Sequence, residues 1–255
     1  MTFQFCDTMD DLLNVYFKDF HIEGTDKPWK VFMGDWIMDE VARALGIEYG
    51  YDADRCCYVL AKVSKTVRAV QMDNLNYGAP VKIYVKNALQ NLNVSNPEEI
   101  RQFMKSYGTH YINSYMTGDA IYQVFTYKKL AYKMLKQRMR RRNASAKLSL
   151  DDLRFYFSSY FLRQVGNVMV ASGNKTLEKW ARRNLRDSQY LYSRPSVLKL
   201  YYNPILAYKL KNSLDDAALL GLDLKILTPI FNSPADAFKY TEMVENDLKL
   251  WEVNA

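Results

Sequence analysis

Histidine is scarce in this chain, and most sequence motifs of catalysis are missing. Only His21 and His110 occur, and neither has a metal-ligand or catalytic-triad partner at a recognisable spacing. No Gly-rich phosphate loop, Walker motif, HExxH or CxxC sequence is present. These gaps argue against an enzyme and predict no metal and no cofactor. A dyad of Cys57 and His110, brought together by folding, is the one catalytic alternative.

Cysteine, glycine and proline are also infrequent. The three cysteines, Cys6, Cys56 and Cys57, are too few for a disulfide scaffold, although one bridge from Cys6 to Cys56 or Cys57 is left open. With ten glycines, seven prolines and no repeated period, the chain has no sign of a solenoid or long linker. Its 255 residues can bury a sizeable core, so we expect a single domain over residues 1–255.

Long apolar runs are absent as well. No uncharged stretch reaches the 18 residues of a membrane-spanning helix, and Met1–Phe20 lacks the basic and apolar parts of a secretion signal. Positive charge is plentiful, because the net charge is +7. It suits a membrane surface, an acidic glycan, nucleic acid or an acidic protein. We favour core or interface roles over base stacking for the twenty tyrosines, and we expect no nucleic-acid partner.

The order of helical and extended patterns predicts an α+β fold. We divide the chain into a first helical cluster (1–57), central strands with a helix (58–127), a second helical cluster (128–194), and a last strand with C-terminal helices (195–255). Alternation of apolar residues predicts long strands at Tyr58–Met72 and Tyr111–Tyr127, and we assign Pro195–Tyr202 to a third strand.

Helix boundaries are marked by capping residues. Asn96 before Pro97 predicts a helix start and Gly108 its end, and Ser149 with Asp152 predicts a second start. Helical spacing also predicts helices at 9–20, 39–45, 176–187, 215–230 and 236–251.

Two basic clusters and three glycosylation sequons are the candidate surface sites. Each cluster can hold an anionic partner, although a solvated helix face is the simpler interpretation. The first cluster contains Lys136, Arg138, Arg140, Arg141 and Arg142, and the second contains Lys175, Lys179, Arg182, Arg183 and Arg186. The sequons, at Asn93, Asn143 and Asn174, fit a secreted glycoprotein.

One motif resembles a known family. The run Tyr107-Gly108-Thr109-His110-Tyr111, with Gly118 downstream, is similar to the signature of membrane-attack-complex/perforin (MACPF) domains. The segment with Gly173, Trp180, Leu185 and Pro195–Leu200 resembles the way such domains close. This resemblance implies a bent antiparallel sheet of four strands, like that of cholesterol-dependent cytolysins, with flanking helical clusters. It assigns Gly108 and Gly118 to the bend and gives a structural role to Tyr107, Thr109, His110, Tyr111 and Trp180.

The resemblance to MACPF domains also implies where the protein acts and what its biological role is. Since three strands are predicted, the first strand and a signal peptide are expected before Met1, and the chain is expected to be N-terminally incomplete and secreted. Short segments such as Tyr111–Tyr115 and Trp180–Arg183 resemble the sequence of an insect member of the MACPF family that signals without lysing membranes. This implies a developmental role, with an extracellular ligand or receptor of a receptor tyrosine kinase pathway as partner, and an anionic membrane surface or extracellular matrix as further candidates.

Pore formation is the alternative. Pore formers of this fold convert helical clusters into membrane hairpins with alternating apolar residues. Residues 153–161 fit that pattern, but Lys136–Arg142 presents Arg on both strand faces. A single glycine at Gly118, where pore-forming members commonly have two, also disfavours sheet opening. We therefore predict a non-lytic protein.

Overall fold

The computed structural model describes residues 1–50, 53–73, 75–141, 148–171, 174–186, 195–214 and 218–254. Its strands are β1 (Thr2–Cys6), β2 (Phe20–Ile22), β3 (Cys56–Gln71), β4 (His110–Lys128), β5 (Leu162–Val165), β6 (Met169–Val170) and β7 (Ala218–Ile226). Its α-helices are α1 (Met9–Tyr16), α2 (Pro28–Met33), α3 (Met38–Ala44), α4 (Ile83–Gln90), α5 (Pro97–Tyr107), α6 (Lys129–Arg141), α7 (Leu150–Tyr156), α8 (Lys175–Asn184), α9 (Lys199–Tyr202), α10 (Pro204–Ser213) and α11 (Pro234–Asn254). Two short 3₁₀ turns, η1 (Ala53–Arg55) and η2 (Thr228–Ile230), complete the described elements.

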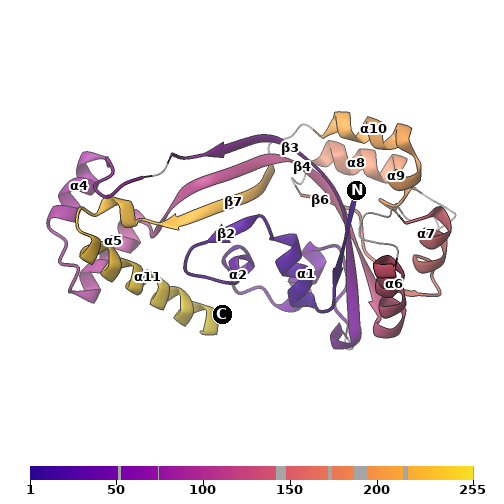
Figure 1. The fold of residues 1–255 in the computed structure, drawn as a ribbon, viewed down its shortest axis with the longest axis horizontal. Helices are drawn as coiled ribbons and strands as arrows, with labels where there is room; N and C mark the ends of the chain where they lie inside the picture. The colour runs from indigo at the N-terminus through magenta and orange to yellow at the C-terminus, as the bar shows by residue number, and fades with distance from the viewer. Residues whose placement is uncertain are drawn as a thin grey trace. The chain divides into compact units, whose positions relative to one another are not determined.

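The strands form one curled, open sheet (Figure 1). Its order among the described residues is β1-β3-β4-β7-β2, and β5 and β6 pair with β4. β1 is antiparallel to β3, with Cys6 opposite Tyr58, whereas β2 is parallel to β7. The predicted α+β class, a bent sheet with flanking helices, is confirmed.

The chain divides into two compact units. The first contains residues 1–18, 35–68 and 116–220, and the second contains 19–34, 69–115 and 221–255. The long strands β3 and β4 and the strand β7 contribute residues to both units.

The core of the first unit lies between the sheet and the helices α6 to α10. Val59 and Phe125 of the sheet are fully buried there, together with Leu135 of α6 and Leu153 of α7. α1 packs against β1, and α9 packs against α10 (Figure 1). Burial of these apolar side chains is the main stabilising contribution to this unit.

A smaller core holds the second unit together. Ile100 and Phe103 of α5 pack with Ile226 of β7 and with Tyr240 and Val244 of α11, and each of these side chains is at most 4% exposed. α11 contacts both α5 and η2.

Several predicted elements are confirmed, and their boundaries follow from local chemistry. The strands at Tyr58–Met72 and Tyr111–Tyr127 are β3 and β4. Asn96 accepts a hydrogen bond from the Glu98 amide at the start of α5, and the side chain of Ser149 caps α7. The predicted helices at 176–187 and 236–251 correspond to α8 and α11.

Three assignments were wrong. The stretch 195–202 is not a strand, because Pro195 forms only an isolated bridge with Arg186 and the chain then enters α9. The helix predicted over 215–230 is replaced by β7, in which apolar residues alternate with Asp223 and Lys225. The sequence also predicts that the first fifty residues are helical, which is wrong because β1 pairs with β3 along the edge of the sheet.

Candidate functional site

The signature segment Tyr107–Tyr111 lies at the junction of α5 and β4. Gly108 ends α5 with a φ of 85°, a conformation that glycine adopts at little cost. The hydroxyl of Tyr240 donates a hydrogen bond of 3.1 Å to the Gly108 carbonyl, and the rings of Tyr107 and Phe103 are 4.8 Å apart. The signature glycine therefore serves as a helix cap tied to α11.

Both ring nitrogens of His110 are occupied. Nε2 lies 2.8 Å from the carbonyl oxygen of Glu23, which can only accept, so Nε2 carries the proton. Nδ1 then accepts from the Thr109 hydroxyl at 2.7 Å. The Glu23 carboxylate in turn accepts from the Ile226 amide at 2.7 Å. His110 thus connects β4 to the loop after β2 and, through Glu23, to β7. This arrangement leaves neither nitrogen available as a base for Cys57, which belongs to the other unit.

Gly118 lies where three strands approach closely. A Cβ atom there would be 2.1 Å from the carbonyl oxygen of Lys65 in β3 and 2.9 Å from Cδ1 of Leu220 in β7. No side chain fits at that distance from a backbone oxygen. Glycine at this position of β4 is a requirement of the sheet itself.

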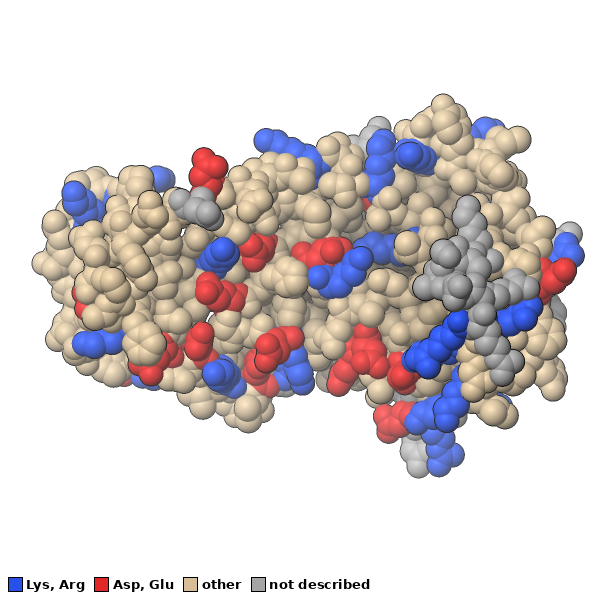
Figure 2. All heavy atoms as spheres, viewed as in Figure 1, with Lys and Arg blue, Asp and Glu red and all other residues tan. Residues whose placement is uncertain are grey.

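The members of the first basic cluster that the structure describes lie on α6, which follows β4 without a connecting loop. Two of its members are engaged, because Lys136 Nζ lies 2.6 Å from Asp7 Oδ1 and Arg138 Nε lies 3.2 Å from Asp152 Oδ1. Arg140 is exposed, and Figure 2 shows Lys and Arg side chains gathered over this helix. The side chains of Arg141 and Arg142 lie outside the described residues.

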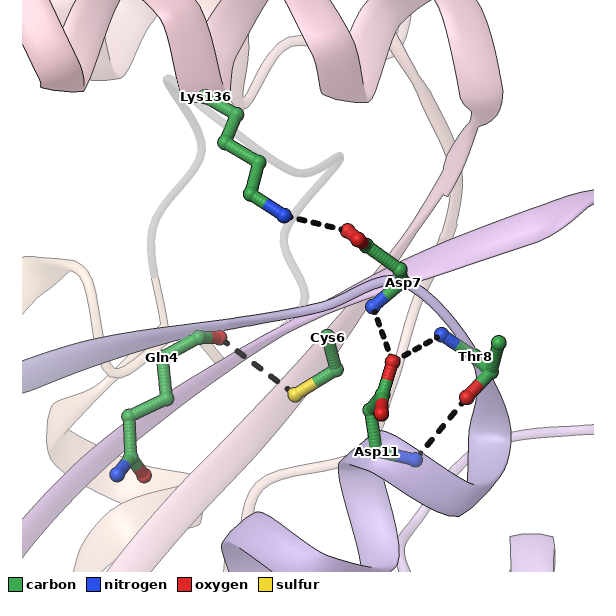
Figure 3. Close-up of polar contacts among 6 residues, drawn as sticks. All are labelled: Gln4, Cys6, Asp7, Thr8, Asp11 and Lys136. Atoms are coloured by element: carbon green, nitrogen blue, oxygen red, sulfur yellow. Dashed lines mark hydrogen bonds and ion pairs between the residues drawn. The ribbon is translucent and has the colours of Figure 1, made fainter.

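Asp7 joins α6 to the start of the chain, as Figure 3 shows. The Asp7 and Thr8 amides both donate to Asp11 Oδ2 at 3.1 Å, and the Asp11 amide donates to Thr8 Oγ1 at 3.1 Å. This capping box fixes the turn between β1 and α1 from which Asp7 reaches Lys136. Lys136 Nζ also lies 5.2 Å from the ring centre of Tyr132, within the range of a cation–π contact. We call Asp7, Tyr132 and Lys136 the α6 clasp.

The electrostatics of the clasp favour the charged pair. The hydrogen bond from Lys136 lowers the pKa of Asp7, and the nearby Tyr132 hydroxyl lowers it further. Behind the clasp, burial raises the pKa of the Cys6 thiol to about 12, and the negative charges of Asp11 and Asp7 act in the same direction. Cys6 is therefore an unreactive thiol at neutral pH.

All three cysteines are free and buried. Cys6 lies directly opposite Tyr58 in the β1–β3 register, so the two side chains share one face of the sheet. The neighbouring residue Cys57 lies on the other face of the sheet from Cys6. It points into the core of the first unit, as Val59 and Ala61 do. A bridge between Cys6 and Cys57 is therefore incompatible with this register.

The structure describes the second basic cluster and two of the three sequons. α8 carries Trp180, which packs against the core of the first unit, and its cations are exposed. Asn93 is exposed, and Asn174 caps α8 by accepting from the Thr176 and Leu177 amides. Asn143 and Gly173 lie outside the described residues.

A buried glutamine, which sequence reasoning missed, organises the segment after 195. Gln123 of β4 is fully buried; its Nε2 donates to the Gly166 and Pro195 carbonyls at 2.8 and 3.2 Å, and its Oε1 accepts from the Val197 amide at 3.1 Å. A polar residue inside the apolar run of β4 was the available signal, because such a group requires buried partners.

Two further surveys concern only the part of the chain that the structure describes. In those residues, no three His, Cys, Asp or Glu side chains are grouped as a metal site would require. Nor does any described helix combine the length and apolarity needed to cross a bilayer.

The fold and the signature define the class of protein. A curled, open sheet of long strands, with helical clusters between them and the signature at the start of β4, is the arrangement that MACPF domains share. The family model described as the MAC/Perforin domain matches residues 52–190, which is more than half of the chain. The chain belongs to the MACPF family.

One similar solved structure supports this assignment at the level of the fold. The structure of GNIP1Aa from Chromobacterium piscinae aligns with a TM-score of 0.51 and 10% identity, covering 98% of this chain and 45% of that one. A putative cell invasion protein with a MAC/Perforin domain from Bacteroides thetaiotaomicron aligns with a TM-score of 0.44 and 10% identity, over 96% of this chain and 50% of that one. The chain thus spans half or less of these two proteins.

Another similar structure is Astrotactin-2, described as a vertebrate-specific, perforin-like membrane protein involved in neuronal development. It aligns with a TM-score of 0.38 and 13% identity, over 86% of this chain and 74% of that one. No curated protein matches the chain in sequence.

Proposed function

We propose that this chain is the MACPF domain of a secreted, non-lytic protein that enables localised activation of the Torso receptor tyrosine kinase in terminal patterning of the embryo. The assignment to the Torso pathway rests on the resemblance of several short sequence segments to the insect protein Torso-like. They are Lys27–Trp29, Tyr111–Tyr115, Tyr122–Phe125, Trp180–Arg183 and Lys249–Glu252. An extracellular ligand or receptor of that pathway is the proposed partner.

The non-lytic part rests on one observation, the placement of basic residues in α6. This helix continues β4 directly, so an extension of β4 into a membrane hairpin would run through it. As a strand, it would place Lys136, Arg138 and Arg140 on one face and Arg141 on the other. An Arg on the lipid side costs about 2–4 kcal/mol at the bilayer midplane. Neither face of the extended segment is therefore suited to lipid.

The packing of α6 supports the same proposal. Tyr132 and Leu135 are 2% and 0% exposed in the core of the first unit. Lys136 and Arg138 lie on either side of these two residues around the helix, and each is held in an ion pair. Release of the helix would expose these apolar side chains and separate both ion pairs. A helix fixed in this way suits a domain that acts through its folded surface.

Pore formation by a perforin-like protein is the competing function. It is favoured by α7 and the residues after it, where one strand face would hold alternate residues that are apolar except for Ser159: Leu153, Phe155, Phe157, Ser159 and Phe161. The two functions differ in whether the protein permeabilises lipid vesicles.

The signalling proposal is tested by receptor activation in insect cells that express Torso. The full-length secreted protein is added together with a limiting amount of Torso ligand, and receptor phosphorylation is measured. We expect phosphorylation to exceed that with ligand alone, and heat-denatured protein to have no effect. Equal phosphorylation with and without the chain, at every ligand concentration, would reject the assignment to this pathway.

A further inference from the structure

The cations of α8 gather on one face of the helix. Lys175, Lys179, Arg182 and Arg183 are all exposed, and Leu177 and Ala181 on the other side are each 2% exposed. At 100° per residue the four cations fall within an arc of about 100°. We call this set the α8 cationic face. Asn174, which caps the helix, fixes its start and hence the register of the four side chains.

The α8 cationic face differs from α6 in its neighbours. None of its four side chains forms an ion pair with another residue that the structure describes, whereas Lys136 and Arg138 of α6 are paired with Asp7 and Asp152. An unpaired cation keeps its full attraction for an anion in solution, since no existing contact must be broken first.

A groove adjoins this face at the C-terminal end of the helix. It has a volume of about 550 Å³ and is lined by Arg182 and Arg186, together with the stretch Gly166–Met169 and Pro195. The Lys199 ammonium donates to the Arg186 carbonyl at 2.8 Å and adds a further positive charge nearby. Glu178 is the one acidic side chain among the described residues that line the groove. The groove therefore extends the cationic face into a concave surface.

The surroundings of the cations indicate which kind of anion fits. Peripheral membrane helices combine cations with exposed apolar side chains, but the residues beside these cations are Thr176 and Glu178. Single-stranded nucleic acids need exposed rings for stacking, whereas Trp180, the one aromatic residue of α8, packs against the core. Guanidinium groups bind sulfate and carboxylate oxygens through paired hydrogen bonds.

We propose that the α8 cationic face and the adjoining groove bind a sulfated glycosaminoglycan, with several sulfate groups of one chain spread along the helix. This goes beyond the proposed signalling function, because it gives the protein an anchor in the extracellular matrix that does not depend on the identity of its receptor. Retention by such a matrix would keep the protein near the cells that secrete it.

The test compares two variants with the same loss of charge. Lys179→Gln/Arg182→Gln/Arg183→Gln removes three cations from α8, and Lys129→Gln/Lys133→Gln/Arg140→Gln removes three exposed cations from α6. All the proteins carry Thr176→Ala, which deletes the Asn174 sequon but keeps the cap, because Asn174 accepts from the backbone amides of Thr176 and Leu177 and not from the Thr176 hydroxyl. Binding of a fluorescent heparin oligosaccharide is titrated at several NaCl concentrations, and the melting temperature confirms folding.

We expect the α8 variant to lose at least about tenfold in affinity near physiological salt. The slope of log K against log salt should become less steep by about two to three, because that many fewer counterions are released on binding. The α6 variant should stay within about threefold of its parent. Equal losses in the two variants would reduce the effect to net charge and overturn the proposal, as would an unchanged affinity of the α8 variant.

A gain of affinity gives an independent check. Glu178→Gln removes the acidic side chain of the groove, so we expect heparin to bind about twofold to fivefold more tightly. Chemically desulfated heparin, anionic vesicles and a single-stranded oligonucleotide serve as competitors. The proposal predicts that none of them competes as well as heparin, and equal competition by any one of them would overturn it. Because heparin binding is measured without receptor or leakage, its failure is distinguishable from failure of the signalling function.

Discussion

Lys136 Nζ and Asp7 Oδ1 lie 2.6 Å apart, so α6 is tied to the turn between β1 and α1 across 129 residues of sequence. The pair is partly exposed, with 59% of the Asp7 side chain accessible, which limits its contribution to stability. Its effect is on position, because it holds α6 against the turn between β1 and α1.

Asp7→Asn should destabilise the chain by about 0.5–1 kcal/mol at pH 7. The folded-state pKa of Asp7 is lowered, so its stabilising contribution is present above the unfolded pKa of about 3.9 and is lost as the pH falls through the folded value. The difference between wild type and variant, measured by urea unfolding, should therefore shrink from pH 7 to pH 3. A double mutant with Lys136→Met should be no less stable than the sum of the single changes predicts. A difference that grows at low pH would contradict the pairing.

Gly118→Ala should be among the most damaging small substitutions in β4. The added methyl group would lie 2.1 Å from the Lys65 carbonyl oxygen, so the strands must separate, and we expect a loss of about 2–4 kcal/mol or failure to fold. Thr117→Ala, at the adjacent half-buried position, is the matched control and should cost about 1 kcal/mol or less. Equal melting temperatures for the two variants would show that the strands do not approach this closely.

The two histidines should respond differently to replacement. His110→Ala removes the bridge between the Thr109 hydroxyl and the Glu23 carbonyl, and should cost about 1–3 kcal/mol. His21 is exposed on β2, so His21→Ala should change the free energy of unfolding by about 0.5 kcal/mol or less. The measurement is chemical denaturation of both variants, with hydrogen exchange of the Ile226 amide as a local readout. Faster exchange is expected for His110→Ala, since Glu23 accepts from that amide.

The cysteines should be inert in the native protein. All three are at most 4% exposed, and burial raises the pKa of Cys6 to about 12 and raises that of Cys57. At pH 8 a chromogenic disulfide reagent should therefore titrate no thiol in native protein and three thiols after denaturation without reductant. One thiol after denaturation would reveal a bridge, and rapid reaction of native protein would contradict the burial.

Local signals in the sequence were enough to predict much of the fold. Asn96, Pro97 and Gly108 mark α5 at both ends, and the alternation in Tyr58–Met72 marks β3. β7 was missed because Leu219, Leu222 and Ile226 also fit helical spacing, although Asp223 and Lys225 alternate with apolar neighbours as in a strand. A short apolar segment supports both interpretations until its partner strand is known.

The contacts that shape the candidate site were harder to predict. The partners Asp7 and Lys136, or Glu23 and His110, are far apart in sequence, and neither pair has a local pattern that links them. Gln123 was noticeable as a polar residue in an apolar strand, but its three backbone partners come from segments around 166 and 195–197. Residue types therefore indicated the family signature, whereas the contacts that its residues make required the folded chain.

The most direct test of the non-lytic account is calcein leakage from anionic vesicles, with co-sedimentation measured on the same sample of full-length protein secreted from insect cells. The account predicts no release above that of a protein-free control, whether or not the protein sediments with the vesicles, because α6 cannot present an apolar strand face to lipid. Dose-dependent release accompanied by ring-shaped oligomers would contradict it and make the protein a pore former.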